Sequence, residues 1–390
     1  MKQMNPEEIR RRIAALVPAD VLAAHVRRGR AAADGRVVVA MSGGVDSSVA
    51  AALACAAGCE VVGVSMRLAP DGGEAQGGCC SLEDFEDARR VADVLGFPHY
   101  VIDFRDAFRS SVVEPFVAAY LAGRTPNPCA LCNRELKFDA LWNFAETLGA
   151  LALATGHYAG IRETEAGVPE LRMAADPDKD QSYFLFELAS EALSRTLFPL
   201  GALRKGDVRE IAGRLLLPVA EKPESQDICF VGKEGYGALV ERLAASDQVR
   251  SGVVVDEAGA VIGSHAGVHK FTIGQRRGLP GGSLEPRYVT EIDAGTGVVH
   301  CGPRAGLERK SVAVSRVTRQ NTEDGGEDLQ VRVRHRHPLV PCRIGGVDES
   351  GRLRIDFERP IIGVAPGQAA VWYRGDTVVG GGWIEGTFDG

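Results

Sequence analysis

The chain has 390 residues, more than one typical domain holds, so we expect two or three domains. With 45% hydrophobic and 25% charged residues its composition is that of a soluble globular protein, and no apolar run is long enough to span a membrane. The net charge of −7 argues against a broad basic surface, although a local basic patch would suffice for nucleic acid. Nine cysteines and no secretory signal predict a cytoplasmic protein with reduced thiols, in which any special cysteine is catalytic or metal-bound.

Residues 1–35 form an N-terminal extension that begins with an amphipathic helix pattern at 6–17. Its basic residues could suggest an organelle transit peptide, but Glu7, Glu8 and Asp20 weaken that interpretation. We therefore expect a peripheral helix ahead of the catalytic domain.

Residues 42–47, Ser-Gly-Gly-Val-Asp-Ser, are the most informative stretch of the chain. They lie between an apolar run that predicts a buried strand and a run that predicts a helix, an arrangement that presents backbone N–H groups to a phosphate. Asp46 would repel a phosphate unless a cation bridged the two, so the pattern favours a Mg²⁺-nucleotide. The alternative is an ordinary turn with an Asp or Ser cap. The stretch resembles the loop of enzymes that cleave ATP to AMP and pyrophosphate, and it differs from a Walker A loop, which needs Gly-Lys-Ser/Thr.

Short apolar strands alternate with helical stretches as far as about residue 155, which predicts a parallel sheet with helices on both faces. In such sheets, ligands bind beyond the carboxyl ends of the strands. The 42–47 loop, Met66 and Gly156 fall at such ends, so we expect them to line one nucleotide pocket. The strands after the first are expected at 61–66, 100–104 and 150–155, and the helices at 83–95 and 136–148.

The second half of the chain is richer in β patterns. Helical patterns are expected around 180–230, and short strands follow turn signals beyond about 236. From 312 onward, apolar and polar residues alternate with period 2, which predicts a small antiparallel barrel. The predicted fold is therefore α/β: a Rossmann-like parallel-sheet ATP-pyrophosphatase domain at 36–235, a small β-rich central domain at 236–302 and a C-terminal antiparallel β-barrel at 303–390.

Cys129 and Cys132 follow two prolines, and we expect Cys132 and Asn133 to open a helix. A thiol at a helix N-terminus near Arg134 should have a lowered pKa, which suits a nucleophile. Three interpretations remain open: a structural zinc site, for which one Cys-x-x-Cys pair is too few; buried structural thiols; or sulfur chemistry at Cys132. Cys229, in the same domain, makes a two-thiol mechanism possible.

Several further stretches, taken together, closely resemble one family. They are Gly-Arg-Thr-Pro-Asn-Pro at 123–128, Leu-Cys-Asn at 131–133, Ala-Thr-Gly-His-Tyr at 154–158, Lys-Asp-Gln-Ser-Tyr-Phe at 179–184, Ile-Cys-Phe at 228–230, Gly-Gln-Arg-Arg-Gly-Leu at 274–279 and Pro-Gly-Gln at 366–368. With the 42–47 loop, they make the chain similar to the tRNA-specific 2-thiouridylases from about residue 36 to the end. These enzymes use ATP to thiolate the wobble uridine of certain tRNAs.

The resemblance implies a set of site residues. The ATP-binding residues would be Ala40, Met41, Ser42, Gly43, Gly44, Val45, Asp46, Ser47, Met66 and Gly156. The residues touching the target base would be Asn127, Pro128 and Cys129, and those contacting the rest of the tRNA Lys179, Asp180, Gln181, Arg334 and His335. Cys132 would be the nucleophile, Cys229 the persulfide carrier, and Asp180 either an acid/base near the uridine or a loop cap.

Arg334 and His335 are expected on a barrel strand, where Arg332, Arg334 and Arg336 would form a ridge of phosphate contacts. Alternating arginines on a strand can also be a solvated face. The wobble base would have to leave its stack to reach a pocket beyond the sheet.

The chemistry implied by the resemblance is coherent. ATP adenylates the C2 oxygen of uridine, the Cys229 persulfide supplies sulfur, and AMP leaves. Cys132 either resolves the linkage to Cys229 or releases hydrosulfide from the persulfide, and both routes leave a Cys132–Cys229 disulfide to be reduced. Many family members have Asp at the position of Cys129, so Cys129, Cys132 and Cys229 could instead hold three corners of a [4Fe–4S] cluster that binds hydrosulfide.

The expected cofactors are ATP and Mg²⁺, with the cluster as an alternative. The expected partners are the anticodon arm of tRNA and a sulfur-relay protein or cysteine desulfurase, and we expect a monomer. The competing functions are an amidating ligase with the same type of loop and a non-catalytic RNA-binding protein that uses the barrel.

Overall fold

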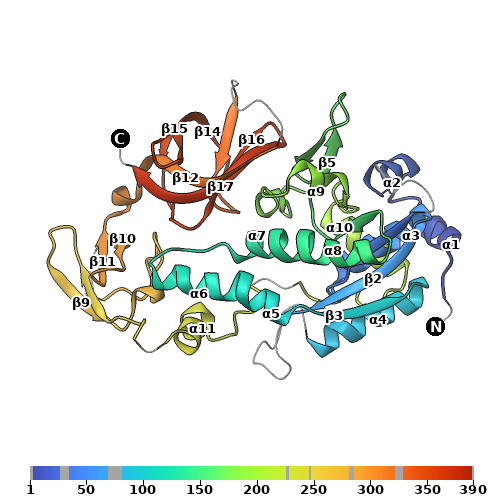
Figure 1. Ribbon diagram of the computed structural model, residues 1–390, viewed down its shortest axis with the longest axis horizontal. Coiled ribbons are helices and arrows are strands. Elements are labelled where there is room, and N and C mark those ends of the chain that lie inside the picture. The colour runs from blue at the N-terminus through green and yellow to red at the C-terminus, as the bar shows by residue number, and fades with distance from the viewer. Residues whose placement is uncertain are drawn as a thin grey trace. The chain divides into compact units, whose positions relative to one another are not determined.

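The computed structural model describes residues 3–26, 35–68, 81–224, 228–245, 247–280, 285–320 and 328–388 (Figure 1). The chain divides into two compact units. The first comprises Met1–Arg109, Cys129–Gly232 and Asp376–Val378, and the second comprises Ser110–Pro128, Lys233–Gly375 and Val379–Gly390. Within the described ranges, no helix combines the length and the apolar character needed to cross a membrane.

The first unit is built on a five-stranded sheet in the order β3-β2-β1-β4-β7, with all neighbours parallel. The parallel sheet and its first four strands were predicted correctly. Val37, Val38 and Val39 of the central strand are fully buried, which explains the continuous apolar run. The strands are β1 (Arg36–Ala40), β2 (Glu60–Arg67), β3 (His99–Asp103), β4 (Ala152–Ala154) and β7 (Thr196–Leu197).

Helix α3 (Val45–Ala57) follows β1 and is buried along almost its whole length. Small residues dominate it, so neighbouring elements approach closely, and Gly58 ends it in the left-handed conformation with φ 88°. The other helices of this unit are α1 (Pro6–Ile13), α2 (Ala19–Val26), α4 (Leu82–Leu95), α5 (Arg105–Phe108), α8 (Leu141–Thr147), α9 (Ser190–Ser194) and α10 (Lys205–Arg214).

The helix expected at the start of the chain is present as α1, which packs one apolar face on the first unit and leaves its other residues more exposed. Ile9 and Ile13 of α1 are almost fully buried in the same cluster as α3. The Arg10 guanidinium donates two hydrogen bonds, of 3.0 and 2.7 Å, to the Ala56 carbonyl in the last turn of α3. The apolar face of this amphipathic helix therefore packs on α3.

A continuous helical run begins at Pro128 and carries the first two thiols of interest. It consists of α7 (Pro128–Cys132), a wide π-helical segment η3 (Asn133–Ala140) and α8. The helix starts earlier than predicted because proline at the first helical position costs no hydrogen bond and has a suitable φ. Cys132 is therefore one turn inside the run, and the argument for a lowered pKa from a helix N-terminus loses its basis.

The stretch after β4 contains a hairpin that the sequence patterns did not reveal, β5 (Gly160–Glu163) and β6 (Pro169–Arg172). The helical texture expected around 180–230 is present in part, as a short 3₁₀ helix η4 (Ser182–Phe184), α9 and α10. Most of the rest is turn and loop.

The second unit contains a small four-stranded sheet in the order β10-β11-β8-β9 and two packed helices, α6 (Glu114–Leu121) and α11 (Gly235–Leu243). Tyr120 of α6 and Tyr236 of α11 stack with ring centroids 4.4 Å apart. The strands are β8 (Gly252–Val255), β9 (Val261–His265), β10 (Tyr288–Asp293) and β11 (Val298–Gly302). The short helical turns are η2 (Arg109–Val113), η5 (Val268–Lys270) and η6 (Arg304–Leu307).

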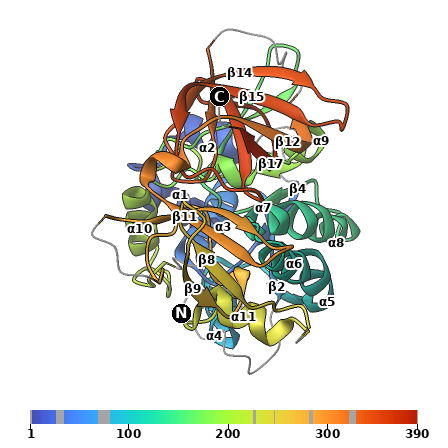
Figure 2. The same cartoon turned by 90° about the vertical axis from the view of Figure 1, so that its left-hand side faces the viewer.

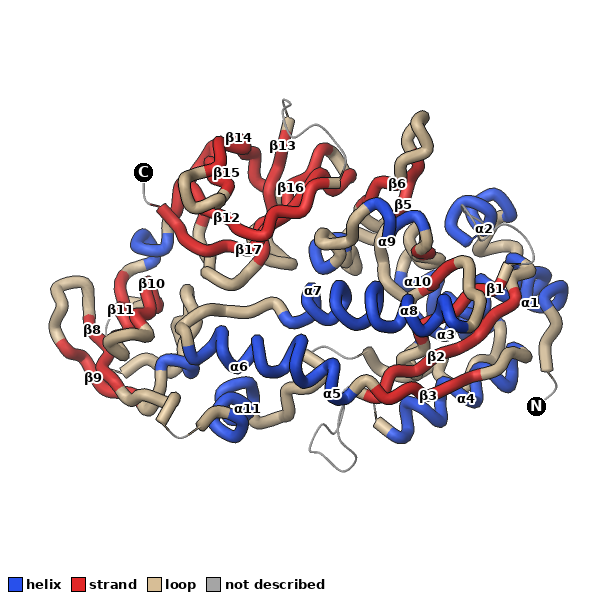
Figure 3. The backbone as a smooth tube through the Cα atoms, in the orientation of Figure 1, coloured by secondary structure: helices blue, strands red, loops and turns tan. Residues whose placement is uncertain are grey.

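The predicted C-terminal barrel is confirmed (Figures 2 and 3). Six antiparallel strands run in the order β12-β15-β14-β13-β16-β17, and pairing of β12 with β17 closes the barrel around a core that includes Trp372 and Ile355. The strands are β12 (Arg309–Arg319), β13 (Leu329–Arg332), β14 (Val340–Val347), β15 (Leu353–Ile361), β16 (Ala369–Arg374) and β17 (Thr377–Phe388).

Arg334 and His335 were expected on a barrel strand, and this is wrong. Strand β13 ends at Arg332, and both residues lie in the turn that follows, which is closed by a 3.0 Å hydrogen bond from His337 N–H to the Arg334 carbonyl. Alternating burial continues past the last strand pairing, so the period-2 pattern was longer than the strand, and Pro338 has no N–H to extend the ladder.

Candidate active site

The turn between β1 and α3 is held in shape by its own serines. The Ser47 hydroxyl accepts a hydrogen bond from the Ser42 backbone N–H at 3.1 Å and donates to the Gly44 carbonyl at 3.2 Å. Ser48 also donates to the Gly44 carbonyl, at 2.8 Å. Gly44 is the N-cap of α3 and supplies no side-chain cap, so the first turn of the helix presents backbone N–H groups next to the loop.

Two glycines are needed where the predicted loop is most crowded. Gly43 has φ 70°, and a Cβ there would overlap the backbone carbonyl of Asp84 at the start of α4. At Gly156, a Cβ would lie 2.7 Å from the Ser47 backbone nitrogen. The segment after β4 therefore presses directly on the loop, as expected if both line one pocket at the carboxyl edge of the sheet.

The other predicted nucleotide residues lie on this same edge. Ala40 ends β1, the Met41 N–H donates to the Val64 carbonyl at 2.8 Å, and Met66 pairs in register with Ile102 near the end of β2. Val45 is buried at the start of α3. The fold thus brings the ten residues to one end of the sheet, and their contacts with a nucleotide stay a prediction.

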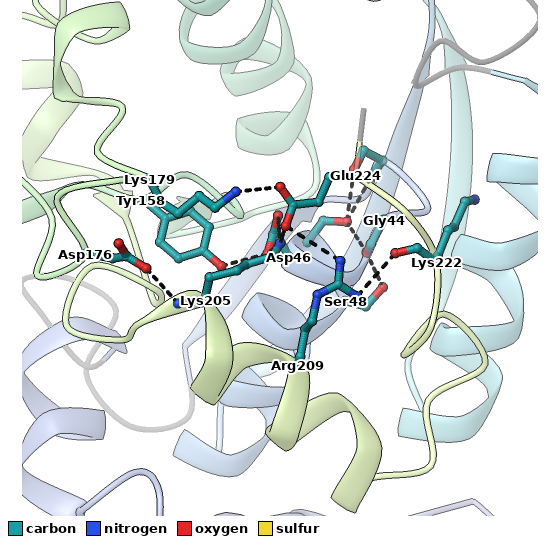
Figure 4. Close-up of polar contacts among 12 residues, drawn as sticks. Gly44, Asp46, Ser48, Tyr158, Asp176, Lys179, Lys205, Arg209, Lys222 and Glu224 are labelled. Atoms are coloured by element: carbon teal, nitrogen blue, oxygen red, sulfur yellow. Dashed lines mark hydrogen bonds and ion pairs between the residues drawn. The ribbon is translucent and has the colours of Figure 1, made fainter. Parts of the chain in front are cut away.

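Asp46 is the centre of a charge network (Figure 4). Its carboxylate oxygens Oδ1 and Oδ2 accept hydrogen bonds from the Lys205 ammonium at 2.7 and 2.8 Å, and Oδ1 also accepts one from the Tyr158 hydroxyl at 2.8 Å. Burial and the neighbouring Asp46 charge raise the pKa of Tyr158 above its ordinary value, so this hydroxyl keeps its proton. Asp46 is therefore oriented by two groups that come from elements far along the chain.

Glu224 joins this network to a segment predicted to contact tRNA. One carboxylate oxygen lies 2.9 Å from the Lys205 ammonium and the other 2.7 Å from the Lys179 ammonium, with Arg209 at 3.6 Å. Burial alone would raise the pKa of Glu224, but the hydrogen bonds and charges of Lys179 and Lys205 outweigh it and lower the pKa to about 2. Glu224 is therefore ionised throughout the neutral range.

Lys222 fixes the same chain segment to α4. Its ammonium lies 2.7 Å from Asp84 and 2.6 Å from Asp87. Burial lowers the pKa of Lys222, but these two carboxylates outweigh burial, and the net shift is upward. Since the Asp84 backbone also lies against Gly43, the loop, α4 and the 222–224 segment support one another.

His157 lies buried beside the π-helical segment. Its Nδ1 is 2.8 Å from the Thr155 hydroxyl, and its Nε2 is 3.4 Å from the Lys137 ammonium, which also donates to Asn133 at 2.9 Å. Burial first, and the Lys137 charge second, lower the pKa of His157 well below its ordinary value. A neutral histidine thus connects the helix that carries Cys132 with the Gly156 turn.

Asp180 and Gln181 organise their own loop. The buried Asp180 carboxylate accepts hydrogen bonds from the Ala174 and Ser182 N–H groups and from the Ser182 hydroxyl, at 3.0 to 3.2 Å. The Gln181 side chain accepts from the Tyr158 N–H at 2.9 Å. These contacts favour the loop-cap interpretation of Asp180, and its role as an acid or base stays a prediction.

The three thiols of interest differ in exposure: Cys129 is exposed, Cys229 is half-buried and Cys132 is buried. Phe230, next to Cys229, packs on Phe108 with ring centroids 5.4 Å apart. Across the described ranges, no three His, Cys, Asp or Glu side chains gather into a group that could hold a metal ion. The described arrangement of thiols therefore does not fit a preformed cluster site.

The remaining predicted tRNA residues belong to the second unit. Asn127 is buried ahead of the 128–147 helical run, Pro128 starts that run, and Arg334 is exposed in the turn after β13, next to His335. Their contacts with tRNA stay predictions.

Sequence reasoning missed Lys205, Arg209 and Glu224, and quoted Tyr158 only as part of a motif. No local pattern marks Lys205, because it reaches Asp46 only through the packing of α10 against α3. A search for cations near the start of a predicted helix would have returned Lys205 without distinguishing it from the other lysines and arginines of the chain.

Comparisons with known proteins agree on one family. The chain matches the tRNA methyl transferase HUP domain over residues 35–233, the tRNA methyl transferase PRC-barrel domain over 241–303 and the aminomethyltransferase beta-barrel domain over 311–384. It is 48% identical over 363 residues to a protein of Rhodospirillum rubrum named tRNA-specific 2-thiouridylase MnmA, with 90% of this chain and 96% of the relative covered. Proteins of the same name from Geotalea uraniireducens and Geobacter metallireducens are 46% identical over 357 and 359 residues, covering 90% of this chain and 95% and 96% of the relatives. The chain belongs to the MnmA family of tRNA-specific 2-thiouridylases.

Proposed function

We propose that this chain is a tRNA-uridine 2-sulfurtransferase that uses ATP to thiolate the wobble uridine of tRNA. The observation that carries the proposal is the serine-held loop at the carboxyl edge of a parallel sheet, with Asp46 fixed in it by Tyr158 and Lys205. Similarity to a tRNA-specific 2-thiouridylase over nine-tenths of the chain supports tRNA as the substrate that is activated at this loop. A protein that acts on tRNA is expected in the cytoplasm.

The first step is adenylation of the uridine C2 oxygen. The backbone N–H groups at the start of α3 and the hydroxyls of Ser42 and Ser47 would hold the phosphates. Asp46 is the residue that would hold Mg²⁺, which typically takes one or two protein carboxylates together with substrate phosphates and so fits this site without a preformed cage. When bound, the ion neutralises the charge that develops on the leaving pyrophosphate. Adenylation converts the C2 oxygen into a leaving group, AMP.

The second step transfers sulfur through two thiols. The terminal sulfur of a Cys229 persulfide attacks C2 and AMP leaves, so Cys229 becomes joined to the base through a disulfide. The Cys132 thiolate attacks the Cys229 sulfur, the S–S bond to the base breaks, and the base keeps its sulfur as the 2-thio group. A Cys132–Cys229 disulfide remains, and an external dithiol must reduce it before the next turnover.

The persulfide has to be loaded by a sulfur-relay protein or a cysteine desulfurase. Cys229 is half-buried and Cys129 is exposed, so a donor can reach this part of the chain more readily than the buried Cys132. Asn127, Pro128 and Cys129 would touch the target base, while Lys179, Gln181, Arg334 and His335 would hold the tRNA. We propose a monomer, which suffices to grip one anticodon arm.

The decisive experiment is thiolation of unmodified tRNA by enzyme purified with and without air, alongside its iron content. ATP, Mg²⁺ and either a persulfide donor or plain sulfide are supplied. We expect an iron-free enzyme that works with persulfide, and loss of thiolation in Cys132→Ala and Cys229→Ala. Cys342→Ala, a buried thiol on β14, is the matched control and should keep its activity.

Two outcomes would change the mechanism or the function. About four irons per chain, with activity only in the anaerobic sample, would replace the persulfide route by a cluster held by Cys129, Cys132 and Cys229. No thiolation under any of these conditions would refute the proposed function.

A further inference from the structure

Lys205 is the first residue of α10, and its ammonium lies in the middle of the candidate ATP site (Figure 4). It is 2.7 and 2.8 Å from the two carboxylate oxygens of Asp46 and 2.9 Å from Glu224. Its side chain is 11% exposed, and its backbone N–H donates to Asp176 at 2.9 Å. The lysine is therefore fixed at both its main chain and its charged end.

The loop itself has no lysine between Ser42 and Ser47. Phosphate loops of the Walker A type carry one, which reaches the β- and γ-phosphates and offsets their charge. Here packing of the first unit brings a lysine to the loop from 159 positions further along the chain. We infer that Lys205 is a further residue of the ATP site and binds the β- and γ-phosphates that leave as pyrophosphate.

The charges around Lys205 support this role. Asp46, Glu224 and Asp176 contribute three negative charges, and Lys205, Lys179 and Arg209 three positive charges, so these six groups balance. A Mg²⁺ ion on Asp46 would neutralise the carboxylate that Lys205 now neutralises, and it would repel the ammonium. The triphosphate bound to the same Mg²⁺ would then pair with the Lys205 ammonium in place of Asp46.

Two neighbours keep the ammonium beside the loop during such an exchange. Glu224 is ionised at neutral pH, with its pKa lowered to about 2, and its carboxylate lies 2.9 Å from the Lys205 ammonium. The Tyr158 ring centroid is 5.8 Å from the ammonium, within the range of a cation–π contact. Lys205 can therefore change its anionic partner by moving its chain end while α10 stays in place.

The test compares nucleotides that differ in the two outer phosphates. Binding of ATP and of AMP, each with Mg²⁺, is measured by calorimetry on the full-length wild type, Lys205→Met and Lys205→Arg. We expect Lys205→Met to weaken ATP binding about 10- to 100-fold, the range for losing a charged hydrogen bond, and AMP binding less than about threefold. Lys205→Arg should restore part of the loss because it keeps the charge.

The matched control is Arg214→Met on the same helix. The Arg214 side chain forms an ion pair with Glu210 one turn away at 2.6 Å, and Arg214→Met removes one positive charge from the same helix α10. Its affinities for ATP and AMP should equal those of the wild type. In tRNA thiolation, Lys205→Met should lower kcat as well as raise the KM for ATP, because the lysine offsets charge that grows as pyrophosphate leaves.

The inference rests on the use of ATP in the proposed function, and the results separate the two. If Lys205→Met keeps ATP affinity within about threefold, or loses ATP and AMP affinity equally, Lys205 only supports the loop and the inference is wrong, while the proposed function stands. If the wild type itself fails to bind Mg²⁺-ATP, both are wrong.

Discussion

The loop at 42–47, proposed to bind ATP, and the barrel turn at 333–337, proposed to bind tRNA, are built in opposite ways. In the loop, the side chains of Ser42, Asp46 and Ser47 have hydrogen-bond partners at about 3 Å, and those of Asp46 come from distant parts of the first unit. In the turn, Arg334 and Arg336 are exposed at the end of a short strand. The loop depends on the placement of single atoms, and the turn depends on charge.

This difference has a direct consequence for mutations. Where backbone atoms leave no room, one added methyl group should abolish activity. Where an exposed arginine attracts phosphate through solvent, its removal should weaken binding only slightly and in a salt-dependent way.

The largest effect is expected from Gly43→Ala. Its Cβ would overlap the Asp84 carbonyl and would be strained at φ 70°, so the loop cannot close around a phosphate. We expect kcat/KM for ATP to fall about 1000-fold, which corresponds to about 4 kcal/mol. The matched control is Gly167→Ala in the β5–β6 turn, which has φ 74° but open space around the added methyl group. If both variants lose activity alike, backbone strain rather than the clash is responsible.

Core substitutions should show whether the two units also differ in how they unfold. Ile13→Ala in α1 and Ile355→Ala in the barrel each empty a buried site, and each should cost about 3 kcal/mol of unfolding free energy. We expect Ile13→Ala to destabilise the first unit and Ile355→Ala the second, measured by urea unfolding followed in segments by hydrogen exchange. Exposed Arg11→Ala on α1 should change neither. Unchanged stability in Ile13→Ala would mean that α1 is dispensable for the core.

Sequence analysis correctly predicted the parts of the fold that short, uninterrupted sequence patterns encode. The loop at 42–47, the strands around it and the barrel all follow from local apolar and glycine patterns, because backbone geometry alone decides them. Lys205 and Glu224 could not be found, since their positions depend on how α10 and the 222–224 segment pack. The packing of α1 on α3 was not predicted because amphipathicity shows which face is apolar, not which element covers it. Arg334 was wrongly placed on a strand because buried and exposed residues continue to alternate beyond Arg332, where β13 ends.

Each unit contains a buried histidine, His157 in the first and His337 in the second. Burial lowers the pKa of both His157 and His337, so each takes up a proton less readily in the folded than in the unfolded chain. Stability is therefore full above the ordinary pKa of about 6.5 and falls as the pH drops below it, by at most about 1.4 kcal/mol per pH unit for each group.

We expect His157→Gln to flatten the loss of stability between pH 7.5 and 5.5 in the first unit only, and His337→Gln to do so in the barrel only. The measurement is urea unfolding at both pH values, followed in segments by hydrogen exchange. Equal flattening in both units by either variant would show that the two unfold as one.

The smallest effect is expected from Arg334→Ala in the turn after β13. An exposed arginine that contacts phosphate contributes modestly, so tRNA affinity should fall about fivefold, and the slope of log affinity against log salt should decrease by about 1. ATP affinity should not change. Arg352→Ala is the matched control, since Arg352 is also exposed but pairs at 2.8 Å with Asp348 in the turn between β14 and β15. Equal losses in both variants would mean that the barrel attracts tRNA by its general charge, and an unchanged affinity in Arg334→Ala would remove this turn from the tRNA-binding surface.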